Sequence, residues 1–127
     1  MAENKEYYTQ EMENGSIQIS EDVVASVTGM AVLEVEGVCG LSRSIGTDIA
    51  EMLGMKTLSK GVRLSTTETG ALRIDCDVVS KFGQNIFELA KNVQENVKSS
   101  VESVTGLRVA EVNVTVCGIA LPKDSKK

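Results

Sequence analysis

The helix that the sequence predicts from Asn85 to Thr105 constrains the fold more than any other segment. Asn85 is a good N-cap, Glu88 completes a capping box, and Gly106 can end the helix in the left-handed conformation. Apolar side chains recur every three or four residues between these ends; they are Ile86, Ala90, Val93, Val97, Val101 and Val104. A helix with one apolar stripe and a charged opposite face must cover another layer of the protein.

Alternating apolar residues predict the strands of that other layer. The stretch after Gly106 alternates through Val112, Val114 and Val116. The stretch "GVRLSTTETGALRIDCDVVS" predicts a hairpin with its turn around Glu68 to Gly70. Two shorter stretches, "GSIQIS" and "GVCGLSRSI", also predict strands.

A second main helix is predicted to follow the N-cap Ser20, to run to about Val35 and to end at Gly37. It is apolar almost all round, which is typical of a helix buried on more than one side. A short helix is predicted from Asp48 to Gly54.

The predicted order is β-α-β-(short α)-β-β-α-β, and the predicted fold class is α+β. It is a two-layer sandwich, a mixed sheet with two main helices packed on one face. Residues 15–121 are predicted to form a single domain between a flexible N-terminal tail, 1–14, and a flexible C-terminal tail, 122–127. The uncovered sheet face, either solvated or a docking surface, is predicted to carry Arg63, Ser65, Arg73, Asp75, Asp77, Glu111, Asn113 and Thr115.

Composition argues against several classes of function. The 13 lysines and arginines against 18 aspartates and glutamates give a net charge of −5, which argues against nucleic acid as a partner. The absence of histidine removes Ser-His-Asp and Cys-His catalysis and histidine metal sites. Cys39, Cys76 and Cys117 lack metal-ligand spacing and indicate reduced thiols in a cytoplasmic protein. No apolar run is long enough to cross a membrane, so we expect no direct membrane insertion. We also expect the protein to use no cofactor.

Two motifs suggest chemistry, and each has a plainer alternative. Asp75 and Asp77, with Glu111 or Asn113 nearby, have the oxygen ligands of a divalent-cation site. The absence of calcium-loop spacing favours a solvated face on which arginines balance the carboxylates. The stretch "GVCG", residues 37–40, formally matches the GxxG loop of nucleic-acid-binding KH domains, but without basic residues it indicates a helix stop.

The end of the first helix offers a candidate interaction surface. Glu34 either contacts a partner or pairs with Arg43, or else it is simply solvated. Ala25, Val32 and Leu33 lie outside the main apolar face of this helix. They either pack against the second helix or form a patch for self-association or another protein.

The stretch "EVEGVCGL" after an apolar helix, and then "VVSKFGQNIFELAKNVQENVKSSVESVTGLRVAEVNVTVCGI", carry a family resemblance. Over about residues 15–121 the chain resembles the alkaline-shock-protein (general stress, Gls-type) envelope stress response family of Gram-positive bacteria. The resemblance implies a non-enzymatic, cytoplasmic protein with no catalytic residues. It also implies assembly with other proteins near the membrane through a membrane-anchored tether.

These observations favour an interaction or scaffold protein of the cell-envelope stress response, with self-association among its possible assemblies. The alternative is a soluble regulatory subunit that modulates a metabolic enzyme supplying lipid precursors. A third hypothesis, an enzyme or metal-binding protein that uses Asp75 and Asp77, ranks well below both.

Overall fold

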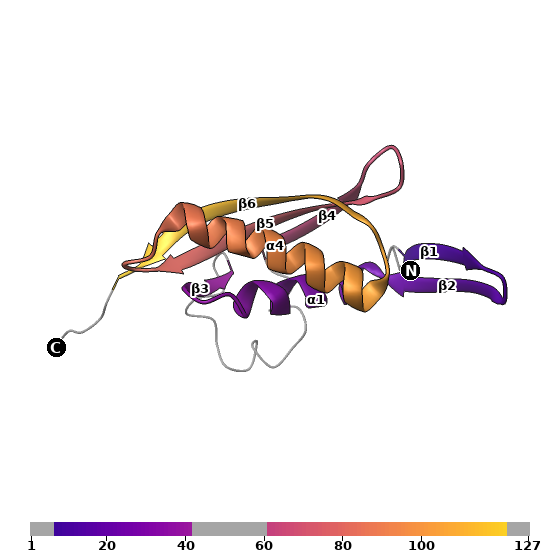
Figure 1. Cartoon of the computed structure of the whole chain (residues 1–127), viewed down its shortest axis with the longest axis horizontal. Coiled ribbons are helices and arrows are strands. Elements are labelled where there is room, and N and C mark those ends of the chain that lie inside the picture. The colour runs from indigo at the N-terminus through magenta and orange to yellow at the C-terminus, as the bar shows by residue number, and fades with distance from the viewer. Residues whose placement is uncertain (1–6, 42–60, 122–127) are drawn as a thin grey trace, which may run out of the picture.

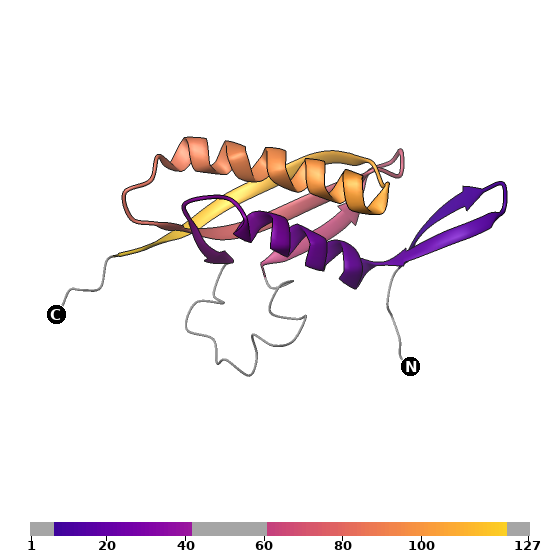
Figure 2. The same cartoon turned by 60° about the horizontal axis from the view of Figure 1, so that its bottom comes forward.

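The computed structural model describes residues 7–41 and 61–121, and it has the α+β fold class that the sequence predicts. Both helices cover the same face of one sheet (Figures 1 and 2). The elements in chain order are β1 (Tyr7–Met12), β2 (Gly15–Ser20), α1 (Glu21–Leu33), β3 (Val38–Leu41), β4 (Val62–Thr66), β5 (Leu72–Lys81), α4 (Ile86–Thr105) and β6 (Val109–Ala120). The short helix predicted from Asp48 to Gly54 lies outside the described residues.

Strand β5 is the centre of the four-stranded sheet. On one of its edges β4 pairs with the first half of β5 and β3 with the second half, both antiparallel. On the other edge β6 runs parallel to β5 along its whole length. Helix α4 makes the crossover that a parallel pair requires, and this gives the mixed sheet that the sequence predicts.

The first strands differ from the prediction. Residues 1–14 were expected to form a flexible tail, but Tyr7–Met12 are β1, paired antiparallel with β2 in a separate two-stranded sheet. The strand predicted in "GSIQIS" therefore exists as β2, although it pairs outside the main sheet. The sequence holds the missed signal, because Asn14-Gly15 is a strong hairpin-turn pair and Gly15 has a φ of 134°.

Helix α1 begins where the sequence predicts and ends two residues early. The backbone N–H of Val23 donates to the Ser20 hydroxyl at 3.2 Å, which confirms the N-cap. The last helical residue is Leu33, and Glu34 follows it as a right-handed C-cap. Gly37, with a φ of 97°, then turns the chain into β3.

Helix α4 confirms both predicted ends. The N–H of Glu88 donates to the Asn85 side chain at 3.0 Å, and Gly106 is left-handed with its N–H on the Glu102 carbonyl. The predicted stripe is wrong at its end, where Val104 is exposed. The buried positions advance in steps of four, through Leu89, Val93, Val97, Val101 and Thr105. The stripe therefore winds round the helix, as a helix packed on a twisted sheet requires.

The core lies between the helices and the inner face of the sheet. Ile74, Cys76 and Val78 of β5 point inward with no exposed surface, and Val32 and Val97 reach them from the two helices. Burial raises the pKa of the Cys76 thiol to about 12, so this cysteine is a neutral core residue. The period of two in β5 leaves its alternate residues on the opposite, uncovered face.

Candidate functional site

The sheet register gathers the predicted polar residues on the open face, defined here as the outward side of β4, β5 and β6. One row across the three strands is Ser65, Arg73 and Glu111; the next is Arg63, Asp75 and Asn113; Asp77 and Thr115 follow. Residues paired across neighbouring strands share a face, so all eight lie on one surface. The prediction of their common location is therefore confirmed.

A two-pronged ion pair joins β4 to β5 on this face. The Arg63 guanidinium donates from Nη1 to Asp77 Oδ2 at 2.7 Å and from Nη2 to Oδ1 at 3.1 Å. These hydrogen bonds and the adjacent positive charge lower the pKa of Asp77, and the carboxylate raises the pKa of Arg63. Both side chains are thus charged and fixed in direction at neutral pH.

A second group of contacts joins β5 to β6. Arg73 Nε donates to Glu111 Oε2 at 3.1 Å. The Asn113 amide nitrogen lies 2.8 Å from Asp75 Oδ1 and 3.0 Å from Glu111 Oε2, so it bridges the two carboxylates. The open face is therefore a fixed array in which each carboxylate has a donor from its own chain.

The contacts of Asp75 and Asp77 bear on the candidate cation site. Both oxygens of Asp77 accept from Arg63, and Oδ1 of Asp75 accepts from Asn113, so three of these four oxygens are already engaged. In the parts of the chain that the structure describes, no three acidic or cysteine side chains come close enough together to hold a metal ion. What the open face offers chemically is a patterned set of charges and hydrogen-bonding groups.

Asp77→Asn tests the Arg63–Asp77 pair. We expect it to lower the free energy of unfolding by about 0.5–1 kcal/mol at pH 7, because the pair is partly exposed. The folded-state pKa of Asp77 is lowered, so this stabilisation is complete above the usual pKa of about 4 and is lost as pH falls through the folded value. Urea titrations of the wild type and variant should converge at acidic pH, and Arg63→Gln should behave alike. An equal gap at both pH values would contradict the assignment.

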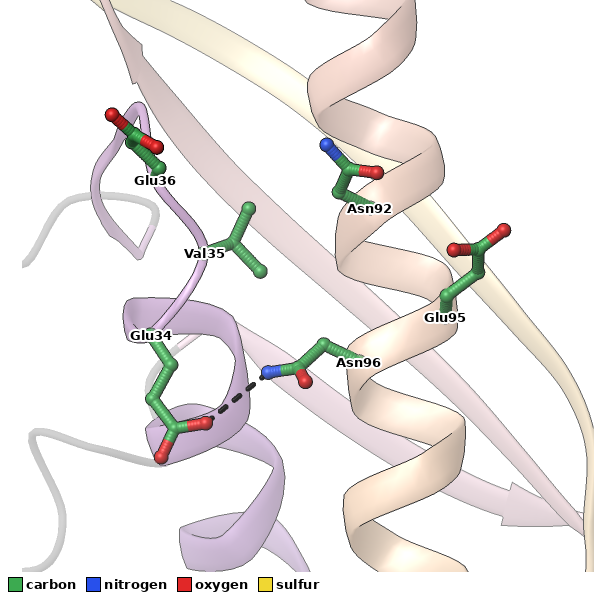
Figure 3. Close-up of a pocket in the computed structure, with 6 residues that line it drawn as sticks. All are labelled: Glu34, Val35, Glu36, Asn92, Glu95 and Asn96. Atoms are coloured by element: carbon green, nitrogen blue, oxygen red, sulfur yellow. Dashed lines mark hydrogen bonds between the residues drawn. The ribbon is translucent and has the colours of Figure 1, made fainter.

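A second feature is an open hollow of about 430 Å³ between α1 and α4 (Figure 3). It is lined by Glu34, Val35, Glu36, Asn92, Glu95 and Asn96. The Asn96 amide donates to the Ala31 carbonyl at 2.7 Å and to the Glu34 carboxylate at 3.3 Å, which ties the end of α1 to α4. Glu34 is exposed; its predicted partner Arg43 lies outside the described residues.

The apolar candidates on α1 separate into buried and exposed residues. Val32 lies in the core with no exposed surface. Ala25 is buried except for 5% of its surface, beside Val62 and Leu64 of β4. Leu33 is 42% exposed at the end of the helix. The plainer alternative, packing against the second helix, therefore describes Val32, which shares the core cluster with Val93 and Val97 of α4. Of the three residues, only Leu33 is largely exposed.

Sequence reasoning missed two exposed apolar groups at opposite ends of the molecule. Met12 and Ile17 are exposed on the β1–β2 hairpin, and Phe82, Phe87 and Leu121 are exposed where β5 and β6 end and α4 begins. A signal for the second group was present, because Phe87 interrupts the polar side of α4 next to the stripe residue Ile86. The signal for the hairpin group is the Asn14-Gly15 pair noted above.

The fold and the open face define a small two-layer α+β domain that presents a patterned charged surface. Residues 9–121 match the model of the alkaline shock protein (Asp) 23 family, which is described as having a cell envelope-related function. The chain belongs to this family, and the resemblance noted in the sequence is confirmed.

Similar proteins occur in Gram-positive bacteria, and the three described here are each named as an uncharacterized protein. Spy1614 of Streptococcus pyogenes is 36% identical over 108 residues, 84% of this chain and 88% of Spy1614. YqhY of Bacillus subtilis is 31% identical over 105 residues, 83% of this chain and 77% of YqhY. YloU of Bacillus subtilis is 35% identical over 107 residues, 83% of this chain and 88% of YloU.

Among solved structures, a variant of the MamM CTD superposes with a TM-score of 0.47 at 14% identity, covering 81% of this chain and 99% of the MamM chain. A likeness at this level carries no argument about function. Within residues 7–41 and 61–121, neither α1 nor α4 has the length and apolar character needed to span a membrane.

Proposed function

We propose that this chain is a non-catalytic interaction protein of the cell-envelope stress response, which works in the cytoplasm and reaches the membrane through a membrane-anchored protein. The observation that carries the proposal is the open face, where charged side chains from three strands are held in one pattern. The cell envelope-related function of the family supplies the setting.

A fixed charge pattern suits recognition of a partner. Arg63, Arg73 and Asn113 are already held by their neighbours, so docking would cost little additional side-chain entropy. Complementary charges on a partner would speed association and exclude wrong partners more than they would raise affinity. The membrane-anchored tether is therefore expected to present charges opposite to the rows of this face.

Exchanging two charges separates recognition from stability. The double variant Arg73→Glu, Glu111→Arg keeps an ion pair between β5 and β6 but reverses its direction as seen by a partner. We expect the free energy of unfolding to change by less than about 1 kcal/mol, because both side chains are exposed. Binding of the purified variant to membranes of the source organism should fall at least ~10-fold, about 1.4 kcal/mol.

Glu95→Arg is the control, because it changes an exposed charge on α4, which covers the side of the sheet opposite the open face. It should bind these membranes as the wild type does. Digestion of the membranes with protease before mixing should abolish binding of the wild type. Undiminished binding of the double variant, or binding that survives protease, would refute the proposed docking. Co-purification with a soluble enzyme whose activity changes would instead favour the regulatory-subunit alternative.

A further inference from the structure

The β1–β2 hairpin, Tyr7 to Ser20, extends from one end of the molecule as an arm (Figures 1 and 2). Its register places Tyr8, Met12, Ile17 and Ile19 on one face. Tyr8 and Ile19 pack against the core at the base of the arm. Met12 and Ile17 continue the same apolar face beyond the body and are 52% and 50% exposed.

Within residues 7–41 and 61–121, nothing covers the outer half of this apolar face. A two-stranded hairpin is marginally stable alone in water and normally needs a third strand or a packed layer. Among the described residues, this support comes from the core contacts of Tyr8 and Ile19 at the base and from Gln10, midway along β1, whose side chain approaches Gly106 at the end of α4. In the described part of the chain, β1 and β2 pair only with each other, so Met12 and Ile17 remain exposed and the outer edges of both strands have no partner strand.

Strand β6 has the complementary deficiency. Among the described residues it pairs only with β5, which leaves its outer edge without a partner strand. At its beginning, two α4 side chains satisfy backbone groups: Glu102 accepts from the Val109 N–H at 3.0 Å and Gln94 donates to the Val112 carbonyl at 2.9 Å. Between residues 7–41 and 61–121, no such contact is made by Val114 to Ala120, so with respect to these residues this stretch, here called the acceptor edge, is open to pairing.

The flank of α4 beside the acceptor edge is apolar and basic. Gln94 marks this flank by its bond to β6, and Phe87, Lys91 and Lys98 lie on the same side at helical spacing. Phe87 is 71% exposed, with the Lys91 ammonium 5.8 Å from its ring centre. The arm has the opposite charge to this flank of α4, because residues 7–20 include Glu11 and Glu13 and no lysine or arginine.

The arm cannot reach the acceptor edge of its own chain. Its base lies by Gly106, where β6 begins, and the acceptor edge lies at the far end of β6 (Figure 1). The acceptor edge begins at Val114, roughly 17 Å along β6, and ends roughly 40 Å along it, whereas the arm beyond Tyr8 is only roughly 15 Å long and points away from the body. A second copy of the chain can bring its arm there.

We infer that the arm of one copy adds to the acceptor edge of the next, with Met12 and Ile17 against Phe87 and the acidic turn near Lys91. Strand addition of this kind obtains affinity from main-chain hydrogen bonds and selectivity from the side chains beside them. Because donor and acceptor lie at opposite ends, the contact is head-to-tail and builds rings or open chains. This inference extends the proposed function by naming a second copy of the chain as one partner. It rests on that function only because both involve protein–protein assembly.

The test uses the purified full chain, so it is independent of any membrane partner. Light scattering behind a sizing column should show wild-type species that grow with concentration. Ile17→Glu, which disables the arm, and Phe87→Glu, which disables the acceptor, should each weaken self-association at least ~10-fold. Met30→Glu, at an equally exposed apolar position on α1, should match the wild type.

Mixing the two disabled variants is the decisive measurement. The Ile17→Glu variant keeps an intact acceptor edge, and the Phe87→Glu variant keeps an intact arm. An equimolar mixture should therefore form dimers and no larger species. Dimer formation would also show that both variants are folded. A monomeric wild type, oligomers unaffected by both substitutions, or a mixture that stays monomeric would overturn the inference. Any of these results would leave membrane binding through the open face standing.

Discussion

Val32→Glu is expected to unfold the domain. Val32 has no exposed surface and lies among Ile74, Val93 and Val97 in the core between the helices and the sheet. A carboxylate there would lose its hydration without gaining a partner, a cost of more than about 4 kcal/mol. Since small domains have about 5–15 kcal/mol of total stability, little or none would remain. Urea denaturation followed by far-ultraviolet circular dichroism measures the loss directly.

Leu33→Glu is the matched control, because it makes the same kind of change at the next residue, where the side chain is 42% exposed. Its free energy of unfolding should stay within about 1 kcal/mol of the wild type. A wild-type unfolding midpoint for Val32→Glu would show that Val32 is not buried in solution. This pair also determines how assembly data are interpreted, because loss of assembly in Val32→Glu would report unfolding rather than a lost contact.

Much of the main sheet and of both helices follows from local patterns in the sequence. Ser20 and Asn85 cap helices where side-chain chemistry predicts, and Gly106 ends one where only a left-handed residue fits. The alternation in β5 assigns Ile74 to the core and Asp75 to the open face. These signals are strong because each depends on neighbours along the chain.

The contacts that decide the candidate sites are less visible in the sequence. Nothing local to Arg63 indicates that its guanidinium reaches diagonally to Asp77 rather than to Asp75 directly opposite. The burial of Val32 depends on the second helix packing beside the first, which is a tertiary choice. The arm was missed because polar residues in β1 hide its alternation, although Asn14-Gly15 marks its turn.

The second large loss of stability is expected from substitution of Gly37. Gly83 is the comparison, because its φ angle is nearly the same. Their φ angles are 97° and 94°, so alanine at either position costs about 1–2 kcal/mol of backbone strain. The surroundings differ. A Cβ on Gly83 would meet nothing within 4 Å, whereas on Gly37 it would lie 2.6 Å from Gln84 Oε1 and 2.9 Å from Leu89 Cδ1.

Gly37→Ala should therefore lower the free energy of unfolding by roughly 2–4 kcal/mol, and Gly83→Ala by no more than the backbone strain. Gln84 is exposed and can rotate away, but Leu89 is fixed in the core, so the overlap with Leu89 should persist. Adding Gln84→Ala to Gly37→Ala should then restore only part of the loss in urea denaturation. Equal losses for the two glycine variants would show that close packing at Gly37 adds nothing to the requirement for a positive φ. Full recovery in the double variant would assign the entire overlap to Gln84 and remove Leu89 from the explanation.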